Sequence, residues 1–207
     1  LAFYADEALS LHRILALRQE LGFPLVLAGL EEGHELVGTL RQADAPLFLT
    51  LDLPEEPTRT SGSDTTVADT TGTPSRYYSP DLQTPSHETV AEEEENLELR
   101  HAMERQTYLE TAATLHEAGL EFGFTSREAD PGDVRSNLRT MIDQGLPEQT
   151  ALAALTTRPA ALLGLDNRLG TVEEGKIANL VVTDGPYFGE DASVQHVFVD
   201  GQLYDYG

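Results

Sequence analysis

The feature that most constrains the fold is an alternation of short apolar runs with amphipathic segments over residues 1–53. The apolar runs have the length and composition of buried strands, and they are residues 1–4, 24–27 and 46–51. The segments between them, 6–21 and 31–43, carry leucines at helical spacing. Strands that alternate with helices in this way are joined by right-handed crossovers, so the sequence predicts a parallel sheet covered by helices.

Residues 54–98 interrupt this alternation. They hold 11 acidic residues and 2 arginines among many Pro, Thr, Ser and Gly, and they include the run Glu92–Glu95. Because few large apolar side chains are present, the segment cannot bury enough surface to offset the entropy of ordering it. We expect an acidic low-complexity insertion that forms an irregular, solvated loop, with one helical turn near Tyr77. The alternative is a binding tail for a basic partner.

Regular structure is expected again after the insertion. Helical spacing and breaker residues predict helices at 97–118, 133–144, 147–157 and 159–164, and a fourth strand at 120–125. The apolar period then changes to that of strands, which are expected at 179–183, 195–199 and 202–204. Asp200-Gly201 has the composition of a tight hairpin turn. The predicted fold class is therefore α/β, with a small antiparallel element at the C-terminal end.

The charge balance excludes one class of partner. The chain has 36 acidic residues against 13 basic ones and a net charge of -23. Nucleic-acid phosphates are bound by lysine and arginine through counterion release, so we expect no nucleic-acid partner. Lys176 is the single lysine. Abundant carboxylates with almost no lysine are typical of proteins from salt-loving organisms, in which salt screens the self-repulsion; the alternative is an acidic protein from an ordinary source.

Cysteine is absent, which excludes a disulfide framework, a thiol nucleophile and cysteine-ligated zinc in this segment. No apolar run reaches the roughly 20 residues of a membrane-spanning helix, so we expect a soluble segment without a membrane span. The compartment stays open between cytoplasmic and exported. The chain begins on an apolar run without an initiator methionine, and we expect it to be a fragment of a longer protein.

Three motifs near the C-terminal end carry a resemblance to a known family. They are Gly-Leu-Pro-Glu at 145–148, Leu-Thr-Thr-Arg-Pro-Ala at 155–160 and Gly-Thr-Val-Glu-Glu-Gly-Lys-Ile-Ala-Asn-Leu-Val-Val at 170–182. In this order they resemble the C-terminal signature of the metal-dependent amidohydrolase superfamily, in the manner of imidazolonepropionase and dihydroorotase. The residues Val197–Gly201 also resemble the closing hairpin of that family.

The resemblance implies the C-terminal half of a (β/α)8 TIM-type barrel plus a small β-sandwich element from the C-terminal strands. It divides the chain into barrel strand-helix units at 1–53, the acidic insertion at 54–98, the final barrel strand and helices at 99–166, and a composite β-sandwich segment at 167–207. The partner implied is the upstream barrel half of the same protein, or a tandem amidohydrolase half.

The resemblance also implies which positions would hold metal ligands. In the family, histidines and an aspartate at the strand ends bind zinc or a similar ion, and the aspartate is the general base for the metal-bound water. The matching positions are Tyr4, Ala28 or Gly29, and Arg127, so all three ligands are replaced. We therefore expect no catalytic residue, metal ligand or cofactor in this segment, with zinc or another divalent metal belonging to the parent protein.

Other residues with suitable chemistry have a more ordinary interpretation. His34 lies one helical turn past the second strand, and its spacing suits a helix surface. Asp130 and Asp133 follow the fourth strand, where a helix N-cap is the expected role. The remaining histidines are expected on surfaces or in packing, and they are His12, His87, His101, His116 and His196.

The sequence leaves three functional hypotheses. The first is a part of an enzyme that hydrolyses C–N bonds, in amides or cyclic amides of a small-molecule substrate, with this half as scaffold and the chemistry elsewhere in the parent. The second is a non-catalytic binding protein on the same barrel. The third is that this half is itself active, with His34 and Asp130 as metal ligands.

Overall fold

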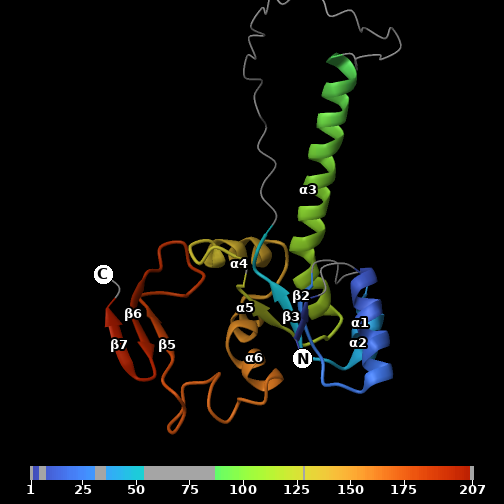
Figure 1. Ribbon diagram of the computed structural model, residues 1–207. Helices are drawn as coiled ribbons and strands as arrows, with labels where there is room; N and C mark the ends of the chain where they lie inside the picture. Colours follow the sequence, from blue (N-terminus) through green and yellow to red (C-terminus); the bar gives the residue numbers. More distant parts are fainter. Residues whose placement is uncertain (1, 5–7, 31–35, 54–86, 128, 206–207) are drawn as a thin grey trace, which may run out of the picture. The chain divides into compact units, whose positions relative to one another are not determined.

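The computed structural model describes residues 2–4, 8–30, 36–53, 87–127 and 129–205, and for 87–95 the backbone alone (Figure 1). It contains two compact units, Pro54–Arg105 and the rest of the chain, Leu1–Leu53 with Gln106–Gly207. The larger unit holds both sheets. Among the described residues, no helix combines the length and apolar character needed to cross a bilayer.

The larger unit is built on a four-stranded parallel sheet. Its strands are β1 (Ala2–Tyr4), β2 (Val26–Leu30), β3 (Leu47–Thr50) and β4 (Gly123–Thr125). They lie side by side in the order of the sequence, and each pairs in parallel with the next (Figure 1). The parallel sheet predicted from the alternation of apolar runs is confirmed.

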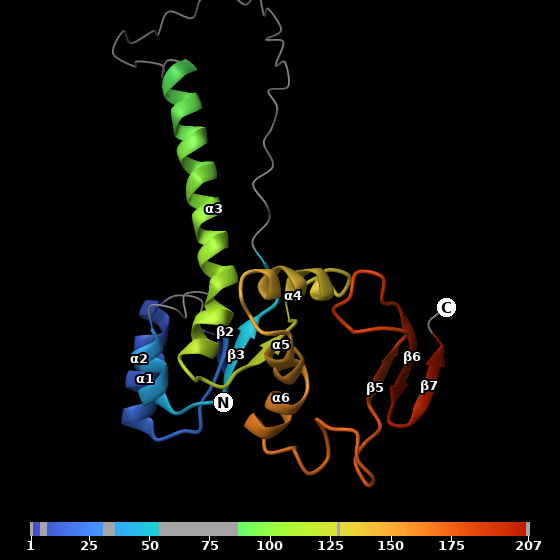
Figure 2. The same cartoon turned by 180° about the vertical axis from the view of Figure 1, so that it is seen from behind.

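Helices connect the strands and bury the apolar side chains of the sheet. They are α1 (Ala8–Leu21), α2 (Val37–Ala43), α3 (His87–Glu117), α4 (Val134–Asp143), α5 (Glu148–Leu155) and α6 (Thr157–Leu162). Figure 2 shows α1 and α2 side by side. Leu11 of α1, Leu27 of β2 and Leu138 of α4 are almost completely buried in one apolar core. Leu11 of α1 and Leu40 of α2 are therefore buried, as the pattern predicts, whereas Leu21 at the end of α1 is exposed.

The helix α3 begins earlier than expected. A start near residue 97 was predicted, whereas the helix starts at His87 and includes the backbone of Glu92–Glu95. The expectation of an irregular loop is therefore wrong for 87–98. Composition indicated too little burial for order, but glutamate is among the better helix formers and is favoured near a helix N-terminus. The expected irregular segment at 54–86, with its turn near Tyr77, lies outside the described residues.

The chain ends in a three-stranded antiparallel sheet of β5 (Leu180–Thr183), β6 (Val194–Val199) and β7 (Gln202–Asp205). The turn between β6 and β7 is Asp200-Gly201, and both residues have positive φ, 51° and 78°. This backbone matches the right-handed twist of the two strands, which explains why an Asp-Gly pair is suited to the turn. The predicted hairpin is confirmed.

Two hydrogen bonds, one buried and one partly buried, tie helices to the carboxyl end of β3. The hydroxyl of Tyr108 on α3 donates to the carbonyl of Thr50 at 2.6 Å. Asn137 of α4 donates from Nδ2 to the carbonyl of Leu51 at 2.9 Å. Both carbonyls lie at the end of the strand, where the ladder of the sheet ends. The side chains therefore satisfy acceptors that the sheet does not use, and they hold the strand end in place.

Candidate functional site

The carboxyl ends of the parallel strands are the first place to look for a site, because ligands of α/β sheets bind there. Tyr4 is the last residue of β1, and Arg127 comes two residues after β4. The Cζ atom of Arg127 lies 4.1 Å from the centroid of the Tyr4 ring. The guanidinium therefore forms a cation–π contact with the tyrosine.

This contact spans the sheet, because Tyr4 and Arg127 belong to its two outer strands. Four strands at a spacing of about 4.8 Å would separate the outer strands of a flat sheet by about 14 Å. Two long side chains can cover that distance only when they point toward each other over the inner strands. The stack thus lies across the carboxyl ends of β2 and β3.

Gly29 of β2 makes room for the tyrosine. Its φ is +70°, and a Cβ atom at this position would lie 3.1 Å from Cδ1 of Tyr4. In the pairing with β3, Ala28 is opposite Phe48 and Leu30 is opposite Leu49, so Gly29 is the extra residue of a β-bulge. A glycine with positive φ is the usual first residue of such a bulge, which bends the strand locally. Tyr4, Gly29 and Arg127, called here the strand-end cluster, are therefore brought together by the fold.

Among the residues that the structure describes, the positive charge of the strand-end cluster takes part in no ion pair. The ion pairs found among the described residues are Arg158–Glu121 and Lys176–Glu173, and neither involves Arg127. Within the same described part of the chain, no group of three or more His, Cys, Asp or Glu is placed to hold a metal ion. What the cluster offers chemically is a set of N–H donors on a fixed cation.

The two aspartates considered as substitutes for a ligand have local structural roles. Asp130 accepts a hydrogen bond from the backbone N–H of Gly132 at 2.7 Å through Oδ1. Asp133 stands at the N-cap position of α4, as expected, but its side chain makes no capping hydrogen bond. Asp130 therefore closes a turn rather than capping the helix.

Three of the described histidines are exposed on the elements that were expected for them. His12 is exposed on α1, His101 is exposed on α3, and His196 is exposed on β6. His34 and the side chain of His87 lie outside the described residues. The ligand role of His34 therefore stays a hypothesis.

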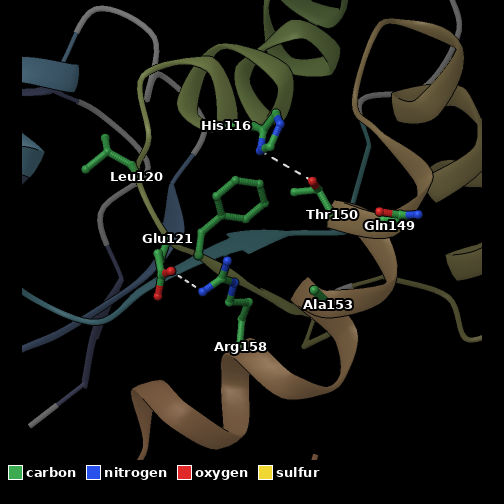
Figure 3. Close-up of a pocket in the computed structure, with 8 residues that line it drawn as sticks. His116, Leu120, Glu121, Gln149, Thr150, Ala153 and Arg158 are labelled. Atoms are coloured by element: carbon green, nitrogen blue, oxygen red, sulfur yellow. Dashed lines mark hydrogen bonds and ion pairs between the residues drawn. The ribbon is translucent and has the colours of Figure 1, made fainter.

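His116 lines a pocket of about 240 Å³ next to the start of β4 (Figure 3). Its Nδ1 atom lies 3.3 Å from Oγ1 of Thr150 on α5, and Arg158 forms an ion pair with Glu121 (Figure 3). The polar groups of the pocket are thus paired with one another. The pocket borders the amino end of the strand, the side of α/β barrels that serves stability. The sequence interpretation missed this grouping, for which the sequence has no local motif.

A second, larger cavity of about 730 Å³ is mostly apolar. Its lining includes Leu152 of α5, Pro159 of α6 and Val181 of β5. Val181 is also among the exposed large apolar residues. An open surface of this composition is suited to packing rather than to chemistry.

One carboxylate outside these places has a shifted pKa. Asp184, directly after β5, accepts hydrogen bonds from the backbone N–H and the hydroxyl of Ser193, both at 2.7 Å. These bonds, with a smaller one from Gln195, lower the pKa of Asp184 below its usual value. The carboxylate stabilises the connection between β5 and β6.

Comparison with known proteins decides the family. The model of the amidohydrolase family matches residues 65–204, more than half of the chain. The chain belongs to the amidohydrolase family. A curated relative, the amidohydrolase tasK of Hapsidospora irregularis, is 44% identical over 57 residues, which are 28% of this chain and 6% of that protein.

Solved amidohydrolase structures share the fold. An amidohydrolase from Thermotoga maritima MSB8 has a TM-score of 0.67 at 22% identity, covering 99% of this chain and 43% of its own. A prolidase solved with N-methylphosphonate-L-proline has a TM-score of 0.61 at 18% identity, covering 100% and 45%. This chain therefore spans less than half the length of these relatives. The likeness supports the α/β fold with a parallel sheet.

Proposed function

We propose that this chain is part of an amidohydrolase-family protein that hydrolyses C–N bonds in amides or cyclic amides, and that the segment is a scaffold without metal ligands of its own. The observation that carries the proposal is the stack of Arg127 on Tyr4 at the strand ends. By the family resemblance, these positions and Gly29 are the ones where ligands of a catalytic metal would stand. The chemistry then belongs to another part of the parent protein.

The residues present do not fit a divalent cation. Gly29 has no side-chain donor, and the guanidinium of Arg127 has only N–H donors and a positive charge. Catalytic zinc typically has about three protein ligands. The phenol of Tyr4 alone does not supply them, and it is already covered by the guanidinium. No catalytic step is therefore routed through a metal in this segment.

The order of the strands supports the assignment to half of a (β/α)8 barrel. Four parallel strands in sequence order are the arrangement of consecutive barrel units, whereas doubly wound sheets reverse direction at a switch point. Among the described strands, β1 and β4 are the outer ones, and each pairs on one side. We propose that an upstream barrel half, of this or a tandem unit, pairs with these edges. We propose likewise that β5–β7 complete a composite β-sandwich.

The second candidate is a non-catalytic binding protein on the same barrel. The contact of Arg127 with Tyr4 at the strand ends is equally compatible with it. The two candidates differ upstream, where an intact His-x-His pair at a first barrel strand favours the enzyme. The third hypothesis, an active half with His34 and Asp130 as ligands, is disfavoured because the Asp130 carboxylate already accepts a backbone hydrogen bond.

The proposal is tested by measuring whether the chain binds zinc. We expect calorimetric titration and elemental analysis of the 207-residue chain to show no stoichiometric, tight site. Arg127→Asp, which restores the residue type of the family, should create neither a tight site nor activity, because two histidines are still missing. Arg13→Asp on the exposed face of α1 is the matched control for the change of charge. Tight zinc binding by the unmodified chain would overturn the proposal and favour the third hypothesis.

A further inference from the structure

We propose that Arg127, held against Tyr4, binds the carboxylate of a small organic acid at the strand ends. The inference rests on the proposed function, since a metal ion at the same place would repel the guanidinium. It goes beyond the proposed function because it assigns to Arg127 an anionic ligand, where the family would hold a metal cation. A scaffold half would then keep a binding role after losing its ligands for a metal.

Within the described part of the chain, no hydrogen bond or ion pair uses the N–H donors of Arg127. A guanidinium is planar and directs its five N–H groups outward in that plane. The contact with the Tyr4 ring, whose centroid lies 4.1 Å from Cζ, is a cation–π contact and not a hydrogen bond, so it does not consume these donors. Among the described residues, no carboxylate forms an ion pair with Arg127. A carboxylate fits the free edge because its two oxygens match two parallel N–H groups.

The contacts of Arg127 differ from those of several other arginines of the chain. Arg18 donates to the carbonyl of Ala43, and Arg139 donates to the carbonyl of Phe188 at 2.8 Å. Arg158 is paired with the carboxylate of Glu121. These side chains serve the fold, because each binds a group of the chain itself. Arg127 is instead oriented by an aromatic ring at the end of the sheet where ligands bind.

The cluster is also pre-organised. The bulge at Gly29 leaves space for the Tyr4 ring, and any side chain at this position would push against that ring. The ring in turn holds the guanidinium through the cation–π contact. A ligand that meets an already oriented arginine loses less affinity to the ordering of a flexible side chain.

The negative net charge of the chain disfavours non-specific binding of carboxylates, so a binding experiment reports a local site. At -23, the chain as a whole repels anions. Non-specific carboxylate binding is therefore unfavourable, and saturable binding reports a local site. An ionic strength of about 0.15 M reduces the range of the global field to about 8 Å.

The probe is N-acetylglycine, a carboxylate that also carries an amide, titrated into the ¹⁵N-labelled 207-residue chain. The NMR signal of the Arg127 side-chain Nε–H is followed and is assigned by its loss in Arg127→Lys. We expect a saturable shift of this signal. The neutral analogue N-acetylglycinamide should produce none. Binding measured through nearby backbone amides should weaken about tenfold in Arg127→Lys, which keeps the charge but loses the paired donors.

Two variants of Tyr4 test whether its ring positions Arg127, because neither variant changes the charge of the chain. Tyr4→Phe keeps the ring and should bind within about twofold of the unmodified chain, whereas Tyr4→Leu should bind several-fold more weakly. The side-chain NMR signal of the exposed Arg13 is the internal reference, because it reports weak association of the probe with an arginine outside the site. A linear Arg127 response equal to that of Arg13, or an equal response to the neutral analogue, would overturn the inference. Tight zinc binding would instead overturn the proposed function, so the two failures are distinguishable.

Discussion

At the scale of single residues, the role of the strand-end cluster is to orient the guanidinium of Arg127. Tyr4 is 48% exposed, and a cation–π contact at an exposed site contributes about 0.5–1 kcal/mol. That is too little to hold the fold together. Its effect is to point the Arg127 guanidinium across the ends of the inner strands. Removal of the contact should therefore alter binding more than stability.

Alanine substitutions at Gly29 and Gly22 test whether Gly29 leaves space for the Tyr4 ring. Gly29 and Gly22 have nearly the same φ, +70° and +68°, but a Cβ would meet Tyr4 at Gly29 and nothing within 4 Å at Gly22. Both substitutions to alanine should cost about 1–2 kcal/mol for the left-handed backbone. Gly29→Ala should cost about 0.5–1 kcal/mol more, because the tyrosine leaves the arginine. Urea denaturation measures the difference, and equal costs would contradict it.

At the scale of elements, a buried hydroxyl links α3 to the end of β3. Tyr108 is buried and donates to the carbonyl of Thr50 at 2.6 Å. In Tyr108→Phe the carbonyl loses this partner, which should lower the free energy of unfolding by about 1–2 kcal/mol. Tyr204→Phe on β7, where the side chain is half exposed, is the control and should be nearly neutral. A Tyr108→Phe variant as stable as the control would show that the hydrogen bond contributes nothing.

The connection between β5 and β6 should depend on pH through Asp184. The hydrogen bonds from Ser193 lower the pKa of this carboxyl in the folded chain. Its contribution is therefore fully present above the unfolded-state pKa of about 3.9, and it is lost as the pH falls through the lower, folded pKa. Asp184→Asn should lower Tm most near neutral pH, and the difference should shrink in acid.

Thermal melts of both chains across the acidic range check the Asp184 prediction. Other carboxylates titrate in the same range, but they are common to the two chains and largely cancel in the difference. Ser193→Ala removes one donor and should reproduce part of the loss. A Tm difference that does not change with pH would mean that the Asp184 charge has no role.

At the scale of the whole molecule, charge should control stability. With a net charge of -23, self-repulsion opposes the compact state, and salt shortens the screening length from about 10 Å at 0.1 M to about 3 Å at 1 M. We expect Tm of the chain to rise with KCl, most steeply below about 1 M. Sorbitol at equal osmolarity is the control for solute effects. A flat or falling Tm in KCl would contradict the prediction that the chain is adapted to salt.

Most elements of the fold were predictable because their signals are local. The apolar run 24–27 and the leucines of 6–21 define β2 and α1 by periodicity alone, and the Asp200-Gly201 pair specifies its own turn. The start of α3 was not predictable from the same reasoning. A glutamate run is compatible with a loop by its low burial and with a helix by its propensity.

The sequence by itself determined the α/β class, the parallel order and the family, since these depend on periodicity and on motifs read along the chain. The family resemblance also predicts that Tyr4, Ala28 or Gly29, and Arg127 replace metal ligands, which stays a prediction. Only the tertiary structure decided that they meet, because Tyr4 and Arg127 are separated by most of the sheet and by the insertion. The physical reason is that a cation–π contact depends on the bulge at Gly29 and on the reach of two side chains over the strand ends, and neither has a periodic signal in the sequence.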